Sequence, residues 1–221
     1  MPGSGVEVVV GVSGASGGRL AHRFVELALT ARELSRLHLV FSAAALDVAR
    51  EEIDRDLVTP EDWIARLAVP RRIAGKVTLH ANARVGASIA SGSYPTAGMI
   101  VVPCSGGTLG AIANGISRDL IGRAADVMLK ERRPLVLALR ESPYSLVHIE
   151  NMRRATRAGA VIMPPTPAFY VAEPSPDRFL DAFCMRAARW LGLTVPGEDF
   201  RWAGGRKSAR QRPGKSRRTA G

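Results

Sequence analysis

The sequence has few cysteines and few aromatic residues. Among its 221 residues are 2 cysteines, Cys104 and Cys184, and the aromatic fraction is 5%. Neither cysteine belongs to a Cys-x-x-Cys pair or to a cluster with histidine at ligand spacing, which argues against a disulfide scaffold and against a zinc site. We therefore expect two reduced thiols in the core and no bound metal.

No apolar run in the sequence reaches the length of a membrane helix. The longest runs, at 99–104 and 135–139, have the length of strands, whereas a spanning helix needs about 20 apolar residues. The first residues lack the basic and apolar regions of a signal peptide. These absences predict a cytoplasmic protein without a membrane segment.

Acidic residues are absent from the end of the chain. Lys and Arg number 31 and Asp and Glu 20, a net charge of +11, and the basic residues after Gly204 are Arg206, Lys207, Arg210, Arg212, Lys215, Arg217 and Arg218. This segment has no apolar periodicity, so we expect one domain over 1–203 and a disordered basic tail at 204–221. No aromatic residue lies among these charges to stack on bases, so any nucleic-acid binding by the tail should be non-specific.

Short apolar runs alternate with amphipathic stretches along the chain. The pattern predicts strands at 6–12, 37–41, 76–80, 99–103, 135–139 and 160–163, and helices at 17–29, 43–53, 108–114, 119–131, 146–158 and 178–191. Continuously apolar strands separated by helices are typical of a doubly wound α/β fold, with a mostly parallel sheet and helices on both faces. Ligands of such folds bind beyond the carboxyl ends of the strands.

Two turns of small residues follow strands of this sheet. Gly11–Gly18 and Pro103–Leu109 are rich in glycine and hydroxyl side chains, and each precedes a helix. Backbone N–H groups and the helix dipole favour a phosphate at such a turn, to which Ser13 or Ser16 would add a hydroxyl. The first turn has neither the dinucleotide-binding nor the P-loop pattern. We expect the two turns to hold one phosphorylated ligand from two sides, the alternative being tight turns without a ligand.

Charged residues near the strand ends are further candidates. Arg140 offers a planar cation after the strand at 135–139, although a surface ion pair with Glu141 is the alternative. Arg123 and Lys130 are seven residues apart and share a helix face, which is either a binding surface or a solvated one. Cys104 has no identifiable base beside it, so we interpret it as a core residue rather than a nucleophile.

The order and spacing of several motifs resemble the UbiX family of flavin prenyltransferases. The resemblance extends from Val6 to about Trp202 and rests on Gly14-Ala-Ser-Gly17, Ser91-Gly-Ser93, Pro103-Cys-Ser-x-x-Thr-Leu109, Arg123-Ala-Ala-Asp-Val127, Leu129-Lys-Glu-Arg-Arg-Pro-Leu-Val136, Arg140-Glu-x-Pro143, Asn151-Met152 and Pro164-Pro-x-Pro-x-Phe-Tyr170.

The resemblance implies a Rossmann-like or flavodoxin-like fold and a homo-oligomer, the dodecamer. It also implies an enzyme that joins the dimethylallyl group of dimethylallyl phosphate to N5 and C6 of reduced FMN, without a metal. The product, prenylated FMN, would serve a UbiD-type decarboxylase. The sequence leaves open whether the donor is the monophosphate or the diphosphate.

The resemblance also assigns roles to matching positions. It implies that FMN is bound by Gly14, Ala15, Ser16, Ser42, Ser105, Gly106, Gly107, Thr108 and Arg140. It implies that the donor phosphate is bound by Tyr170 and Arg186, with Lys130, Arg123, Ser91 and Gly92 near it. Glu52 and Glu141 are the acid/base candidates, with Ser16 as a proton relay and Lys130 beside the leaving group. Glu51 is an equally acidic neighbour of Glu52.

The sequence departs from the family pattern after the first turn. Where the family has an aromatic residue, this chain has Leu20, and Trp202 is a candidate to replace the missing aromatic wall. Two other functions stay open. A flavin-dependent peptidyl-cysteine decarboxylase would need an active-site histidine, which none of the four histidines supplies in a suitable context. A non-catalytic flavin-binding or nucleic-acid-binding protein would not need Lys130 and Glu141 together.

Overall fold

Six parallel strands form the central sheet of the computed structural model, which describes residues 5–171, 174–197 and 200. The strands are β1 (Val6–Val12), β2 (Leu34–Phe41), β3 (Val77–His80), β4 (Gly98–Cys104), β5 (Leu135–Leu139) and β6 (Val161–Ile162). Their order across the sheet is β3-β2-β1-β4-β5-β6. This order is the doubly wound, Rossmann-like one, and it confirms the predicted fold class.

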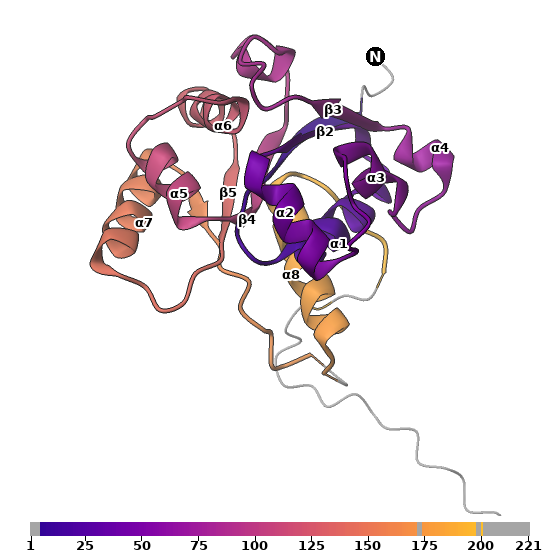
Figure 1. Ribbon diagram of the computed structural model, residues 1–221. Coiled ribbons are helices and arrows are strands. Elements are labelled where there is room, and N and C mark those ends of the chain that lie inside the picture. The colour runs from indigo at the N-terminus through magenta and orange to yellow at the C-terminus, as the bar shows by residue number, and fades with distance from the viewer. Residues whose placement is uncertain (1–4, 172–173, 198–199, 201–221) are drawn as a thin grey trace, which may run out of the picture.

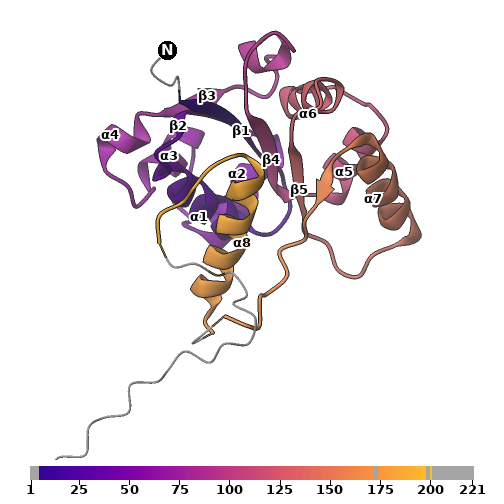
Figure 2. The same cartoon turned by 180° about the vertical axis from the view of Figure 1, so that it is seen from behind.

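Helices connect the strands and cover both faces of the sheet (Figures 1 and 2). They are α1 (Gly18–Leu29), α2 (Ala43–Glu52), α3 (Pro60–Ala65), α4 (Arg71–Ala74), η1 (Ser88–Ala90), α5 (Gly106–Ala113), α6 (Leu120–Lys130), α7 (Leu146–Ala158) and α8 (Pro176–Trp190).

The core has two parts because successive strand residues point to opposite faces of the sheet. Val8, Val10 and Val12 of β1 pack on the face that α1 and α8 cover. Val9 packs on the opposite face, which α6 covers together with buried residues of α5 and α7. All five residues of β5 are buried, as expected for a strand with helices on both sides.

The segment without a predicted pattern contains short helices. Thr59 begins α3, and its side chain accepts a hydrogen bond from the Asp62 N–H while Asp62 accepts one from the Thr59 N–H. This capping box, followed by a proline at the first helical position, is a start signal that the sequence analysis missed. Trp63 of α3 is 1% exposed and anchors the segment to the core. The short helices α4 and η1 were not predicted either. The six predicted strands and six predicted helices lie at the expected places, to within a few residues.

The order of the strands fixes where a ligand site belongs. β1 lies between β2 and β4, so the connections leave its two sides in opposite directions. At such a switch point the loops diverge and leave a crevice beyond the carboxyl ends of the strands. The turns after β1 and β4 both border this crevice.

Some predictions fall on other parts of the chain. The proposed basic tail at 204–221 and Trp202 lie outside the described residues. Among the residues that the structure describes, no helix is long and apolar enough to span a membrane.

Candidate functional site

Ser13 joins the two small-residue turns at the switch point. Its hydroxyl donates to the carbonyl oxygen of Pro103 at 2.8 Å and accepts from the N–H of Ser105 at 2.8 Å. Ser13 is 1% exposed. The predicted juxtaposition of the two turns is thus present, but Ser13 holds them together and is not available to a ligand, contrary to the sequence analysis.

Backbone donors remain open on both turns. Within the described part of the chain, no hydrogen-bond acceptor faces the N–H groups of Gly14, Ala15 and Ser16, or those of Gly106 and Gly107. Successive unpaired N–H groups and a helix N-terminus form a concavity that suits an anion. The arrangement therefore offers phosphate-binding donors from two directions.

Ser42 adds an unsatisfied hydroxyl beside these turns. It precedes α2, and its N–H donates to the carbonyl oxygen of Val12 at the end of β1. The Oγ atom is buried and has no hydrogen-bond partner within the described structure. A buried hydroxyl without a partner is costly, so a polar ligand atom beside Ser42 would stabilise this region.

Glu52 occupies the start of α1. Its carboxylate accepts from the Gly17 N–H at 2.8 Å and from the Gly18 N–H at 2.6 Å. The predicted phosphate cradle over Gly11–Gly18 would need these two donors, but Glu52 occupies them. Burial alone would raise the pKa of Glu52, but hydrogen bonds from Ser16 and from both glycines, with the charge of Arg140, outweigh it and lower that pKa. Glu52 is therefore a carboxylate at neutral pH, within reach of Ser16.

The carboxyl end of β5 brings further candidates to the same place. The Arg140 N–H donates to the Cys104 carbonyl oxygen at 3.0 Å and ties this end to β4. A Cβ atom at Gly106 would stand 2.8 Å from His148 Nε2 and 3.6 Å from Glu141 Oε2. Both side chains thus lie over the first turn of α5. The sequence analysis missed His148, although the Ser145-x-x-His148 spacing is that of a helix start.

Replacement of Gly14 by alanine is expected to destabilise the protein by about 1–3 kcal/mol, the usual cost of overpacking. A Cβ atom at Gly14 would lie 2.4 Å from the Cβ atom of Ala44. Gly86→Ala is the matched control, because a Cβ atom there meets nothing within 4 Å. The stability of both variants is measured as the urea midpoint of unfolding. Equal midpoints for the two variants would contradict close packing of Gly14 against Ala44.

A second group of candidates lies along α6, which ends with Lys130 near the amino end of β5. Lys130 ends α6 shortly before β5 begins, and its Nζ atom stands 2.5 Å from the position of a Cβ atom at Gly92. Arg123 donates to the Ala90 carbonyl oxygen at 3.2 Å and pairs with Asp126. β5 separates this group from Arg140 by roughly 15 Å, at about 3.3 Å per residue. Lys130 therefore lies against Gly92, and Arg123 contacts Ala90 at the start of the same segment, two turns of α6 away from Lys130. Lys130 and Gly92 lie far from the turns.

Tyr170 and Arg186 belong to a third place in the chain. Tyr170 lies between β6 and α8, and Arg186 lies on the exposed side of α8. α8 and α6 cover opposite faces of the sheet (Figure 2). Arg186 on α8 and Lys130 on α6 are therefore on opposite sides of one chain. A single chain does not gather all the residues predicted to bind the donor phosphate.

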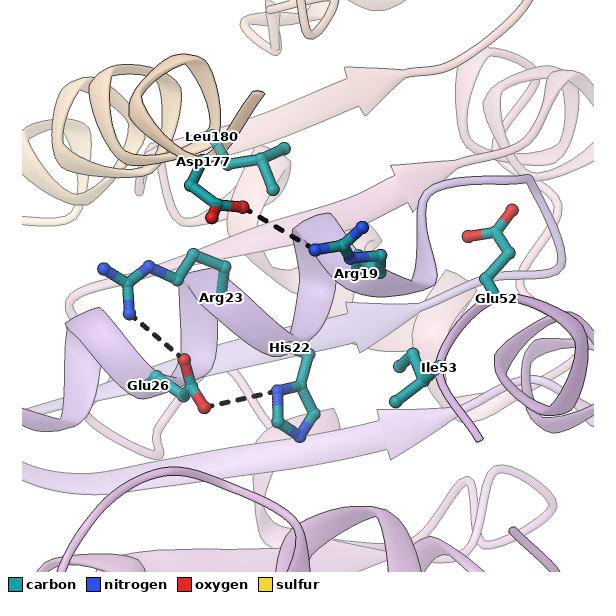
Figure 3. A pocket seen from close by; sticks show the side chains of 8 residues that line it. All are labelled: Arg19, His22, Arg23, Glu26, Glu52, Ile53, Asp177 and Leu180. Atoms are coloured by element: carbon teal, nitrogen blue, oxygen red, sulfur yellow. Dashed lines mark hydrogen bonds and ion pairs between the residues drawn. The ribbon is translucent and has the colours of Figure 1, made fainter. Parts of the chain in front are cut away.

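Three cavities border these groups separately. A cavity of about 580 Å³ lies beside α1, the end of α2 and the start of α8, and of the predicted residues it is lined by Glu52 alone (Figure 3). Gly107 and Thr108 line another of about 400 Å³, and Lys130 a third of about 430 Å³. None of these three cavities holds the complete predicted set.

Two further predictions concern the core. Cys104 is completely buried, and burial raises the pKa of its thiol to about 12, so it is a core residue as predicted. Leu20 is 3% exposed and packs in the core beneath α1. Its side chain therefore forms no wall of the crevice, and the departure from the family pattern at this position changes the core rather than the site.

Sequence comparison shows what the chain is similar to. The Flavoprotein family model matches residues 3–178. The flavin prenyltransferase UbiX of Escherichia coli strain K12 is 39% identical over 199 residues, which cover 89% of this chain and 98% of that protein. The flavin prenyltransferase UbiX of Halalkalibacterium halodurans is 39% identical over 189 residues, with 83% and 87% covered.

Solved structures agree with this similarity. AnUbiX (PadA1) in complex with FMN and dimethylallyl pyrophosphate is 39% identical, covers 90% of this chain and all of its own, and gives a TM-score of 0.73. The dodecameric FMN-dependent UbiX-like decarboxylase of Escherichia coli O157:H7 is 37% identical, with the same coverage and TM-score. The cysteine decarboxylase TvaF, at 15% identity and a TM-score of 0.55, shares the fold alone. The chain belongs to the flavin prenyltransferase UbiX family of flavoproteins.

Proposed function

We propose that this protein is a flavin prenyltransferase that joins the dimethylallyl group of dimethylallyl phosphate to reduced FMN. The observation that carries the proposal is the crevice at the switch point, which combines open N–H groups on two turns with a buried Ser42 hydroxyl at the end of β1 that has no partner within the described residues. The crystal structure of a 39% identical relative holds FMN together with dimethylallyl pyrophosphate.

The residues at the crevice fit FMN. The open N–H groups of Gly14, Ala15 and Ser16 and those of Gly106 and Gly107 would bind its phosphate and polar oxygens, with Ser42, Ser105, Thr108 and Arg140 beside them. When it is bound, reduced FMN supplies the atoms N5 and C6 that accept the prenyl group. Glu52 stays ionised and accepts a hydrogen bond from Ser16, so this pair is placed to take up and return a proton. Glu141 is a second carboxyl group at the first turn of α5.

Cationic residues would assist departure of the phosphate. Negative charge grows on the phosphate as its bond to the allyl carbon breaks, so fixed donors stabilise the transition state more than the ground state. Lys130, Arg123 and Arg186 supply positive charges opposite the phosphate, and Tyr170 offers a hydroxyl donor. These residues are divided between two places in one chain, with Lys130 and Arg186 over opposite faces of the sheet.

We infer that neighbouring copies complete the site in a homo-oligomer. The start of α7 exposes apolar side chains next to the crevice, with Leu146 72% exposed, Val147 67% and Ile149 49%. Adjacent exposed apolar side chains mark an interaction surface. A UbiX-like relative is dodecameric, which supports the same assembly for this chain. Packing of copies would bring Lys130 of one copy toward Arg186 of another.

Two further parts of the proposal concern the cell. Prenylated FMN is a product that another enzyme must use, and the family resemblance makes that enzyme a UbiD-type decarboxylase. The absence of membrane-spanning helices within the described residues is compatible with action in the cytoplasm.

Anaerobic incubation with reduced FMN and dimethylallyl monophosphate or diphosphate tests the reaction. Mass spectrometry of the extracted flavin is expected to show FMN heavier by one five-carbon unit, and Glu141→Gln should not form it, since a carboxamide cannot exchange a proton as an acid or base. Bound FMN that stays unmodified with both donors would contradict the prenyltransferase proposal and leave a flavin-binding protein.

A further inference from the structure

Polar side chains from the neighbouring strands β1, β2 and β3 contact one another and Tyr94, outside the crevice. Glu7 Oε2 accepts from the Tyr94 hydroxyl at 2.6 Å and lies 2.8 Å from His38 Nε2. His38 Nδ1 lies 2.9 Å from His80 Nε2. His38 is 1% exposed. These four residues, the Glu7–His38–His80–Tyr94 network, have no role in the proposed reaction.

One placement of protons satisfies every contact in the network. His38 donates from Nε2 to Glu7 and accepts at Nδ1 from the Nε2–H of His80, which makes both imidazoles neutral. Burial lowers the pKa of His38 against the opposing effect of Glu7, and burial together with His38 and Arg84 lowers the pKa of His80. Both rings are therefore uncharged at neutral pH.

Glu7 is the charged member of the network. Burial alone would raise its pKa, but hydrogen bonds from Tyr94 and His38, together with the positive charge of Arg36, lower it overall. The contacts of the carboxylate are thus complete above its ordinary pKa and are lost only as the pH falls through the lowered value. Its hydrogen bond to Tyr94 persists throughout the neutral range.

Tyr94 connects this network to the Ser91–Ser93 segment. The Tyr94 N–H donates to the Ser91 carbonyl oxygen at 3.2 Å. On the other side, Arg133 donates to the carbonyl oxygens of Gly92 and Tyr94, both at 2.7 Å. The segment is therefore held from two directions, by a side-chain anchor in the sheet and by a guanidinium group.

The segment is also fitted closely against the end of α6. A Cβ atom at Gly92 would stand 2.1 Å from Glu131 Oε1 and 2.5 Å from Lys130 Nζ. The hydroxyls of Ser91 and Ser93 lie 2.9 Å apart on this segment. A small displacement of the segment would therefore change the spacing between its hydroxyls and the Lys130 ammonium group.

We propose that Tyr94, held by Glu7 and His38, is a positioning residue that fixes the Ser91–Ser93 segment against Lys130 for binding of the donor phosphate. This inference rests on the proposed function. Hydrogen bonds that converge on the buried His38 and on the half-buried Glu7 favour one arrangement of the network. Apolar side chains at the same places would pack without fixing the segment. The network is thus coupled to substrate affinity and not to flavin binding.

The test compares Tyr94→Phe, Glu7→Leu and the double variant as FMN-loaded proteins, because leucine at position 7 removes the acceptor of the Tyr94 hydroxyl. Loss of a hydrogen bond to a charged group corresponds to about a tenfold change. We expect KM for dimethylallyl phosphate to rise about tenfold in each variant, with kcat within about twofold and FMN affinity unchanged. The double variant should be no worse than either single one, because both act through one bond.

Thermal unfolding and hydrogen exchange accompany the kinetics. We expect faster amide hydrogen exchange in residues 88–97 of Tyr94→Phe. Its unfolding temperature should stay near that of the original protein. An unchanged KM, or a parallel loss of KM, kcat and FMN affinity, would overturn the proposal. If the original protein makes no prenylated FMN, the proposed function fails by itself. Calorimetric binding of dimethylallyl phosphate to the same variants then decides the role of Tyr94, and equal affinities would reject it.

Discussion

Replacement of Glu52 by glutamine is expected to lower the rate of flavin prenylation about a hundredfold or more, the range typical of a lost acid/base group. The carboxylate accepts from the Gly17 and Gly18 N–H groups and lies within reach of Ser16. A carboxamide cannot accept a proton from Ser16, and its NH₂ group would meet backbone donors. Quenched-flow mass spectrometry at saturating substrate concentrations measures the rate.

Glu51→Gln is the matched control for this variant. Glu51 precedes Glu52 on α2 but is exposed, whereas Glu52 faces the turn. The Glu51→Gln variant should prenylate FMN at the original rate, because the Glu51 carboxylate that it removes is exposed to solvent. Equal losses in the two variants, or a loss that follows FMN affinity in Glu52→Gln, would contradict a proton-transfer role for Glu52.

Lys130→Ala and Arg186→Ala are each expected to abolish product formation alone and to recover part of it when co-assembled. The two residues lie on helices that cover opposite faces of the sheet. If a site takes Lys130 from one copy and Arg186 from another, random mixing at equal amounts leaves about one quarter of the sites intact in a symmetric assembly. The activity of the mixed assembly after joint refolding or co-expression measures this fraction.

Mixing the variants after separate assembly is the control for subunit exchange. Light scattering of Leu146→Asp/Val147→Asp provides an independent check, since charges on these exposed apolar side chains should disrupt association. No recovery in a mixed assembly of the original size would show that each chain builds its site alone.

The alternation of apolar runs and amphipathic stretches predicts the fold well, because it depends only on local sequence. Residues 8–12 of β1 and all of β4 and β5 form continuously apolar runs because both faces of the sheet are covered there. This burial leaves a pattern that is visible in the local sequence. The short helix α3 was missed because its sequence has a start signal but too few residues for periodicity.

The candidate site was predictable where a motif follows a strand. Parallel strands place their carboxyl ends at one edge, so Ser16, Ser105 and Arg140 come together from sequence positions far apart. The family resemblance predicted Glu52 as an acid/base residue. An alignment cannot show that its carboxylate accepts hydrogen bonds at the start of α1. Only the approach of α2 to the first turn makes that contact and separates Glu52 from Glu51.

By itself, the sequence determined the class of fold, the family and the turns that border the crevice, because these depend on local patterns of burial and on backbone conformation. Tertiary structure alone decided that Ser13 joins two turns, that His148 lies over Gly106, and that Tyr94 is anchored by Glu7. It also placed Lys130 and Arg186 over opposite faces of the sheet. Such contacts join residues distant in sequence, and their geometry is set by the packing of whole elements rather than by any local pattern.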